Sequence, residues 1–169
     1  DKLFFKPEKF YAENQINIHT QSEVDSINPE NKYINVSGSQ FSYDSLVLAT
    51  GSSPRKLNLE NSEADNILYL RDISDAEKIK TYIEAVEHIT LIGGGYIALE
   101  VAAAIIESGK MVTILELEDR ILKRVTSEEI SNFYHNYHSK KGVDIRCSTG
   151  LETIQMEGNK MISVRDRKS

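Results

Sequence analysis

Residues 89–106 read ITLIGGGYIALEVAAAII, a glycine triplet between two apolar runs. The first run predicts a strand covered on both faces, and residues 96–108 predict a helix. Between them stands the pattern G-x-G-x-x-A, in which the first glycine makes a tight turn and the second lets a pyrophosphate approach the backbone. The N–H groups at the helix start attract phosphate charge. The stretch predicts a dinucleotide site formed by Gly93, Gly94, Gly95, Tyr96, Ile97 and Ala98.

The next predicted strand, residues 111–116, ends on an acid that can distinguish between nucleotides. Glu116 lies about twenty residues after the glycines, where a carboxylate accepts hydrogen bonds from the adenosine ribose hydroxyls and repels a 2′-phosphate. This favours NAD(H) over NADP(H). Arg120 lies four residues further on and could reach a phosphate, so it is a candidate nucleotide contact that leaves NADP(H) open.

A second acid lies inside the predicted helix. Glu100 is surrounded in sequence by Ile97, Leu99, Val101 and Ala102. Because an unpaired carboxylate is costly to bury, we expect Glu100 either to meet a functional partner or to turn to solvent on a polar face.

The flanking sequence predicts a β-α-β-α-β series. Strands and helices alternate, with Gly109 and Gly142 placed where left-handed residues end helices. Such a series forms a parallel sheet with helices packed on both faces, an α/β fold of the Rossmann type. The predicted elements are a helix at 76–86 capped by Asp75 or Ser74, strands at 88–92, 111–116 and 143–147, helices at 96–108 and 127–140, and a hairpin of residues 151–156 and 160–166 around Gly158-Asn159.

The amino-terminal part has a different pattern. Short β-rich runs at 16–20, 23–28 and 32–37 predict an antiparallel meander with a turn at Pro29–Lys32. Residues 43–50, YDSLVLAT, predict a buried strand that stops at Gly51. The polar residues 57–67 predict a connector, and we expect the chain to cross there from one domain to another.

Composition excludes several classes of protein. The 169 residues carry a net charge of −6, which gives no positive footprint for nucleic acid or an anionic membrane. The longest apolar stretch, 89–106, holds three glycines and Glu100, so it is not expected to span a membrane. Cys147 is the only cysteine, so an internal disulfide is excluded and a reducing, cytoplasmic location is expected.

Cys147, His135 and His138 are candidates for redox or metal-binding roles. Cys147 falls in a predicted strand without a partner cysteine, which favours a buried small side chain over a redox role. His135 and His138 have a spacing that can hold a metal, but the neighbouring Tyr134 and Tyr137 favour a packed helix face. No metal site is expected.

With these residues identified, the chain resembles the FAD-dependent pyridine nucleotide-disulfide oxidoreductases, and most of all the NADH-dependent ferredoxin and rubredoxin reductases. The resemblance rests on FKPEKFYAENQINI (5–18), YDSLVLATGSSPR (43–55), ILYLRDISDAEKIK (67–80), ITLIGGGYIALEVAAAII (89–106) and DRILKRVTSEEISNFYHNYHSKKGVDI (119–145). It implies hydride transfer from NADH to FAD and onward electron transfer to a ferredoxin or rubredoxin. It also implies that Tyr96 and Glu100 lie near the nicotinamide, and that FAD is approached by Val24, Ala49, Thr50, Gly51, Arg55 and Arg71.

The resemblance is to a central part of that family. Its glycine-rich FAD fingerprint, its second FAD motif and its interface domain are not found in this sequence. We therefore expect part of an FAD domain at 1–53, a crossing linker at 54–72 and an NAD(H) domain at 73–169 that lacks its last strand. The alternatives are a nucleotide-binding module without turnover, a disulfide or coenzyme A-disulfide reductase, and a flavin oxidase.

Overall fold

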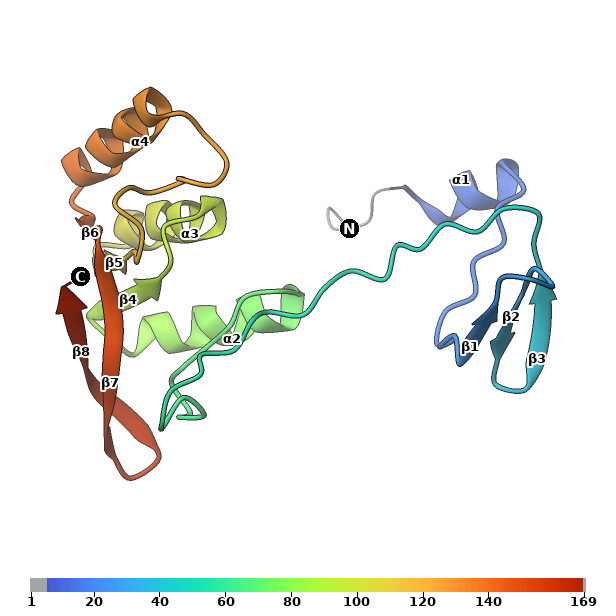
Figure 1. The fold of residues 1–169 in the computed structure, drawn as a ribbon, viewed down its shortest axis with the longest axis horizontal. Helices are drawn as coiled ribbons and strands as arrows, with labels where there is room; N and C mark the ends of the chain where they lie inside the picture. The colour runs from blue at the N-terminus through green and yellow to red at the C-terminus, as the bar shows by residue number, and fades with distance from the viewer. Residues whose placement is uncertain (1–5, 169) are drawn as a thin grey trace. The chain divides into compact units, whose positions relative to one another are not determined.

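The computed structural model describes residues 6–168, which form two separate units. The first unit ends at Gly51 and the second begins at Ser52 (Figure 1). Residues 54–72, expected to be a linker, thus belong to the second unit. Their polar groups bond to the carboxyl-terminal hairpin: Asn66 Nδ2 donates to the carbonyl of Met161 at 2.8 Å, and Asn61 Nδ2 donates to that of Ile154 at 3.2 Å.

The first unit is a small antiparallel sheet preceded by one short helix. The helix is α1 (Glu8–Glu13), and the sheet has the order β1 (Ser26–Asn28), β2 (Tyr33–Val36) and β3 (Ser39–Ser42). The meander was predicted, but α1 and β3 were not, and residues 16–20 form no strand.

The strand predicted at 43–50 is wrong. This apolar segment has no strand partner among the described residues, and the Val47 side chain is 84% exposed. A β-strand exists only where its N–H and C=O groups meet a neighbouring strand. An apolar run of this kind is typical of a strand, but without a neighbouring strand among the described residues it does not form one.

The second unit contains the predicted parallel sheet, in the order β4 (His88–Ile92), β5 (Met111–Leu115) and β6 (Asp144–Arg146). Helix α3 (Tyr96–Glu107) joins β4 to β5, and α4 (Glu128–Lys140) joins β5 to β6. Figure 1 shows both helices on one side of the sheet and α2 (Ile73–Glu84) on the other. Two successive right-handed crossovers in the same direction place their helices on one face.

Capping and turn residues set most of these boundaries. Asp72, rather than Asp75 or Ser74, is the N-cap of α2, and it forms a capping box with Asp75. Gly109 and Gly142 have φ of +79° and +100°, as expected after α3 and α4. The hairpin of β7 (Thr149–Glu157) and β8 (Lys160–Lys168) turns at Gly158, as predicted.

The core lies between α3 and the parallel sheet. Apolar residues of both elements, together with the loop after β5, bury their side chains there. The fully buried members include Leu99, Ala102, Ile105, Val112, Ile114, Ile121, Leu122 and Val143. This core fixes the carboxyl ends of β4 and β5, where the glycine turn and Glu116 are found.

Candidate functional site

The glycine triplet forms the turn that the sequence predicted. Gly93 has φ of +97°, which glycine adopts without steric cost, and its N–H donates to the carbonyl of Leu115 at 2.8 Å. Gly95 is the N-cap of α3, and no described atom lies within 4 Å of a Cβ built on it. Within residues 6–168, no side chain caps this helix end. The arrangement leaves backbone N–H groups and open space for an anion.

Gly94 has a role that sequence reasoning missed. A Cβ at this position would lie 2.7 Å from Cγ2 of Ile121 and 3.0 Å from Oε2 of Glu116. Its carbonyl also accepts from the N–H of Leu122 at 2.9 Å. The loop after β5 therefore packs directly on the turn, and only glycine fits between them. No local pattern signals this, because Ile121 and Leu122 are distant in sequence.

Glu116 is held beside the turn by both of its carboxylate oxygens. Oε2 accepts from the N–H of Gly94 at 2.5 Å, and Oε1 accepts from the N–H of Glu118 at 2.8 Å. The side chain is half-buried. Because each carboxylate oxygen can accept a second hydrogen bond, Glu116 can also receive hydroxyl groups of a ligand. The structure thus brings together the two features that the sequence predicted, Gly93–Gly95 and Glu116.

Arg120 is turned into its own loop. Its guanidinium donates to the Ser131 hydroxyl at 2.5 Å and to the carbonyls of Thr126 and Lys123, both at 3.2 Å. Ser131 is itself buried and donates to the carbonyl of Ile121 at 2.7 Å. These bonds join the start of α4 to the loop that packs on the glycine turn, so Arg120 supports the site from within the loop.

The first turns of α3 face away from the core. Tyr96 and Ile97 are 49% and 60% exposed, and Glu100 is exposed as well. Glu100 does not lie among the core side chains of α3, since Leu99 and Ala102 occupy the buried stripe of the helix. Of the two options that the sequence left for Glu100, the described residues show the solvent-facing one.

The residues assigned to FAD fall in both units. Val24 and Ala49–Gly51 belong to the first unit, where they are exposed and Gly51 has φ of +72°. Arg55 and Arg71 belong to the second unit. The Arg71 Nε donates to the carbonyl of Ser52 at 2.7 Å, so this side chain holds the start of the second unit.

The other reactive groups weighed from the sequence are Cys147 and the helix α4 histidines. Burial, with a further contribution from Glu116, raises the pKa of the Cys147 thiol above its ordinary value, which disfavours the thiolate. His138 is buried on α4 with its ring near Tyr134, and burial lowers its pKa. Among the described residues no group of three acidic, histidine or cysteine side chains is placed to hold a metal ion.

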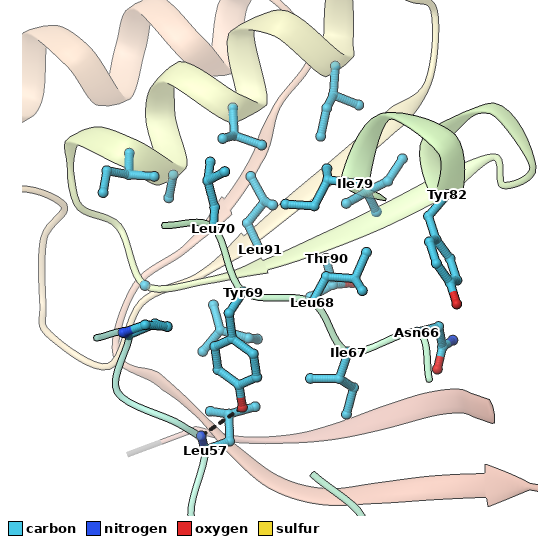
Figure 2. Close-up of a pocket in the computed structure, with 18 of the residues that line it drawn as sticks. Leu57, Asn66, Ile67, Leu68, Tyr69, Leu70, Ile79, Tyr82, Thr90 and Leu91 are labelled. Carbon is cyan, nitrogen blue, oxygen red and sulfur yellow. Dashed lines mark hydrogen bonds between the residues drawn. The ribbon is translucent and has the colours of Figure 1, made fainter. Parts of the chain in front are cut away.

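A pocket of about 610 Å³ lies along β4. All five residues of β4 line it. Because successive side chains of a strand point to opposite faces of the sheet, a pocket that touches all of them lies along the edge of the strand. That edge has no partner among the described strands. Figure 2 shows apolar side chains from several elements around this space, and the hydrogen bond of 2.9 Å from the Leu57 N–H to the Tyr69 hydroxyl. Labelled examples are Ile67, Leu68, Leu70, Ile79 and Leu91.

A parallel sheet with a glycine turn at its carboxyl edge, and with a carboxylate at the end of the adjacent strand, defines a dinucleotide-binding α/β unit. Comparison with known proteins gives the family. The profile of the pyridine nucleotide-disulphide oxidoreductases matches residues 6–168, and the chain belongs to this family.

The relatives that the chain matches include reductases of small electron carriers. It is 39% identical over 160 residues to the putidaredoxin reductase of Pseudomonas putida, covering 92% of this chain and 38% of that protein. It is 33% identical over 151 residues to a rubredoxin-NAD(+) reductase of Pseudomonas putida, covering 89% of this chain and 39% of that protein. The chain thus spans well under half the length of these relatives.

Solved structures agree. A ferredoxin reductase from Rhodopseudomonas palustris superposes with a TM-score of 0.88 at 32% identity, covering 96% of this chain and 40% of that one. The covalent putidaredoxin reductase–putidaredoxin complex gives a TM-score of 0.85 at 37% identity, with 96% and 40% covered. Across residues 6–168, none of the helices has the length and apolar character needed to cross a bilayer.

Proposed function

We propose that this chain is the NAD(H)-binding part of an FAD-dependent reductase, which passes hydride from NADH to FAD and electrons onward to a ferredoxin or rubredoxin. The observation that carries the proposal is the contact between the glycine turn and Glu116, joined by the 2.5 Å hydrogen bond from Gly94. The turn offers N–H groups to a pyrophosphate, and the carboxylate offers acceptors to a ribose. The names of the matched relatives support the electron carrier as partner.

NADH is proposed over NADPH because of charge. A 2′-phosphate would bring a second anion against Glu116, and Arg120 does not offset it, since its guanidinium is bonded to Ser131 and to loop carbonyls. The same reasoning assigns Arg120 to the support of the site rather than to direct nucleotide contact.

The flavin is proposed to meet the nicotinamide near the start of α3. Tyr96 and Glu100 are both exposed there and available to a ligand. FAD, when bound, accepts hydride and releases electrons singly, and the protein orients the two cofactors and excludes water. Residues 1–53 are proposed as part of the FAD domain, with Val24, Ala49, Thr50, Gly51, Arg55 and Arg71 as its contacts.

The open edge of β4 supports the proposal that the NAD(H) domain, 73–169, lacks its last strand. A parallel sheet is normally covered on both faces and paired at its strands. Here an apolar pocket of about 610 Å³ follows an edge strand that has no partner among the described strands. Its lining also includes Gly93 and Gly95 of the glycine turn, so only the part of the pocket along β4 is assigned to completion of the sheet.

The test is nucleotide binding to this chain, measured by calorimetry and thermal shift with NADH and NADPH. We expect NADH to bind and stabilise the chain, and NADPH to bind more weakly. Glu116→Gln should weaken NADH binding by about tenfold or more, since a hydrogen bond to a charged group contributes about 1.5–3 kcal/mol. Glu107→Gln, the same change at an exposed position late in α3, is the control and should leave binding unchanged. Equal binding of both nucleotides by the wild-type chain would contradict the role of Glu116.

A second candidate is a nucleotide-binding module without turnover by itself. It is favoured by the exposed segment around Val47, which pairs with no strand among residues 6–168. A colourless preparation that binds NADH would support this reading for the isolated chain. Stopped-flow reduction of flavin by NADH in the longer protein, followed by cytochrome c reduction with and without ferredoxin, would test turnover.

A further inference from the structure

The charged side chains that follow Glu116 are paired with one another. The Glu118 carboxylate accepts from Nζ of Lys123 at 3.1 Å and from Nη2 of Arg124 at 3.3 Å. Lys123 also meets Asp119 at 3.2 Å. The hydrogen bonds from the two cations hold the pKa of Glu118 below its ordinary value, and those from Glu118 and Asp119 raise the pKa of Lys123. Lys123 and Arg124 therefore both have anionic partners.

This charge cluster is fixed next to the proposed ribose site. The N–H of Glu118 donates to Oε1 of Glu116 at 2.8 Å, and its carbonyl accepts from the N–H of Ser148 at 2.8 Å. The contact with Glu116 is thus made by backbone, while the Glu118 side chain, 32% exposed, is used for the cations.

We propose that Glu118 is a positioning residue for cofactor choice, which keeps Lys123 and Arg124 engaged and so withholds both cations from a 2′-phosphate. The inference rests on the proposed function, because it requires Glu116 to face the adenosine ribose. A phosphate monoester carries about −1.5 to −2 charges at neutral pH and needs cationic partners. At this site a 2′-phosphate would lie beside the Glu116 carboxylate. Lys123 and Arg124 are paired with Glu118, and Arg120 is bonded inside the loop.

The test compares Kd values of the full chain for NADH and NADPH before and after Glu118→Gln. We expect the Kd for NADPH to fall by about threefold to tenfold, the range that a freed Arg124 and a Lys123 held only by Asp119 can supply. The Kd for NADH should stay within about twofold, and the gain in NADPH binding should disappear at high salt. Glu107→Gln makes the same charge change on an exposed residue of α3 and should move neither Kd.

A second set of variants separates this role from a structural one. Lys123→Gln with Arg124→Gln, added to Glu118→Gln, should return NADPH binding to the wild-type level. The same pair in the wild-type background should leave NADPH binding unchanged, because both cations are already engaged there. An unchanged NADPH-to-NADH ratio in Glu118→Gln, or weaker NADPH binding when the pair alone is replaced, would overturn the inference. If the wild-type chain binds neither nucleotide, the proposed function fails as well; if it binds NADH normally, only the role of Glu118 fails.

Discussion

The two units of the chain differ in whether their apolar side chains find a core. In Ser52–Ser169, residues such as Ile114 and Ala102 are fully buried. In the described part of Asp1–Gly51, no side chain is buried, and several large apolar side chains are exposed. These are Ile16, Ile18, Val24, Ile27, Phe41, Leu46, Val47 and Leu48.

The difference shows that apolar runs of similar composition can either form a core of their own or remain exposed. In the second unit the apolar runs fold onto each other as strand, helix and strand. In the first unit the apolar side chains form surfaces that no described residue covers, as expected of strands that belong to a larger sheet. The proposed nucleotide site lies in the unit that has its own core.

The largest expected effect comes from separating the two units. Residues 52–169 expressed alone should unfold cooperatively, because they retain the whole buried cluster. Residues 1–51 alone should show no cooperative transition, since small domains bury too little apolar surface even when well packed. Thermal denaturation followed by circular dichroism measures both. A cooperative melt of 1–51 would remove the distinction between the units.

The next effect is the cost of truncating one isoleucine in each unit. Ile114 is 0% exposed in the core of the second unit, so Ile114→Ala should lower the free energy of unfolding by about 2–5 kcal/mol. Ile27 is 41% exposed in the first unit, and Ile27→Ala should cost about 0.5 kcal/mol or less. Urea titration gives both values. Equal costs would show that the first unit has a core of its own.

A smaller effect separates two glycines that are required for different reasons. Gly94→Ala places a methyl 2.7 Å from Ile121, so it should destabilise the chain by about 1–3 kcal/mol and weaken NADH binding by moving Glu116. Gly38 has φ of +81° and open space around it, so Gly38→Ala should cost about 1–2 kcal/mol of backbone strain and leave NADH binding intact. Calorimetry and thermal shift on both variants measure the contrast; NADH affinity lost in both would contradict it.

The smallest effect concerns pH. Burial lowers the pKa of His138 in the folded chain below its unfolded value of about 6.5. The neutral ring is favoured on folding, so this stability is fully present above pH 6.5 and is lost as pH falls through the lower folded pKa. His138→Gln should flatten the decline in stability below about pH 6.5. Urea midpoints at several pH values give the slopes; identical slopes for the wild-type chain and His138→Gln would exclude His138 as the cause.

The parts of the fold that sequence could predict are those whose signals are local. The alternation around Gly93, Gly109, Gly142 and Gly158 gave the second unit nearly residue by residue, because each glycine marks a turn next to an apolar run. The segment 43–50 was misassigned because its apolar run requires a strand partner that the described residues do not contain.

In the candidate site, the contacts that depend on three-dimensional packing could not be predicted from the sequence. The meeting of Gly93–Gly95 with Glu116 followed from the order of strands. The need for glycine at position 94 did not, because it depends on where Ile121 packs. The apolar sequence neighbours of Glu100 left two positions open for its side chain, and the solvent-facing one is found because Leu99 and Ala102 form the buried stripe of the helix.

The two backbone hydrogen bonds to Glu116 have a consequence for how a nucleotide binds. Confining a free glutamate side chain costs about 1.5–2 kcal/mol of rotamer entropy. Here folding has already imposed that order, since the N–H groups of Gly94 and Glu118 hold both oxygens before any ligand arrives. A ribose bound as proposed would therefore meet a preorganised acceptor, and its affinity would not be reduced by the cost of ordering the Glu116 side chain.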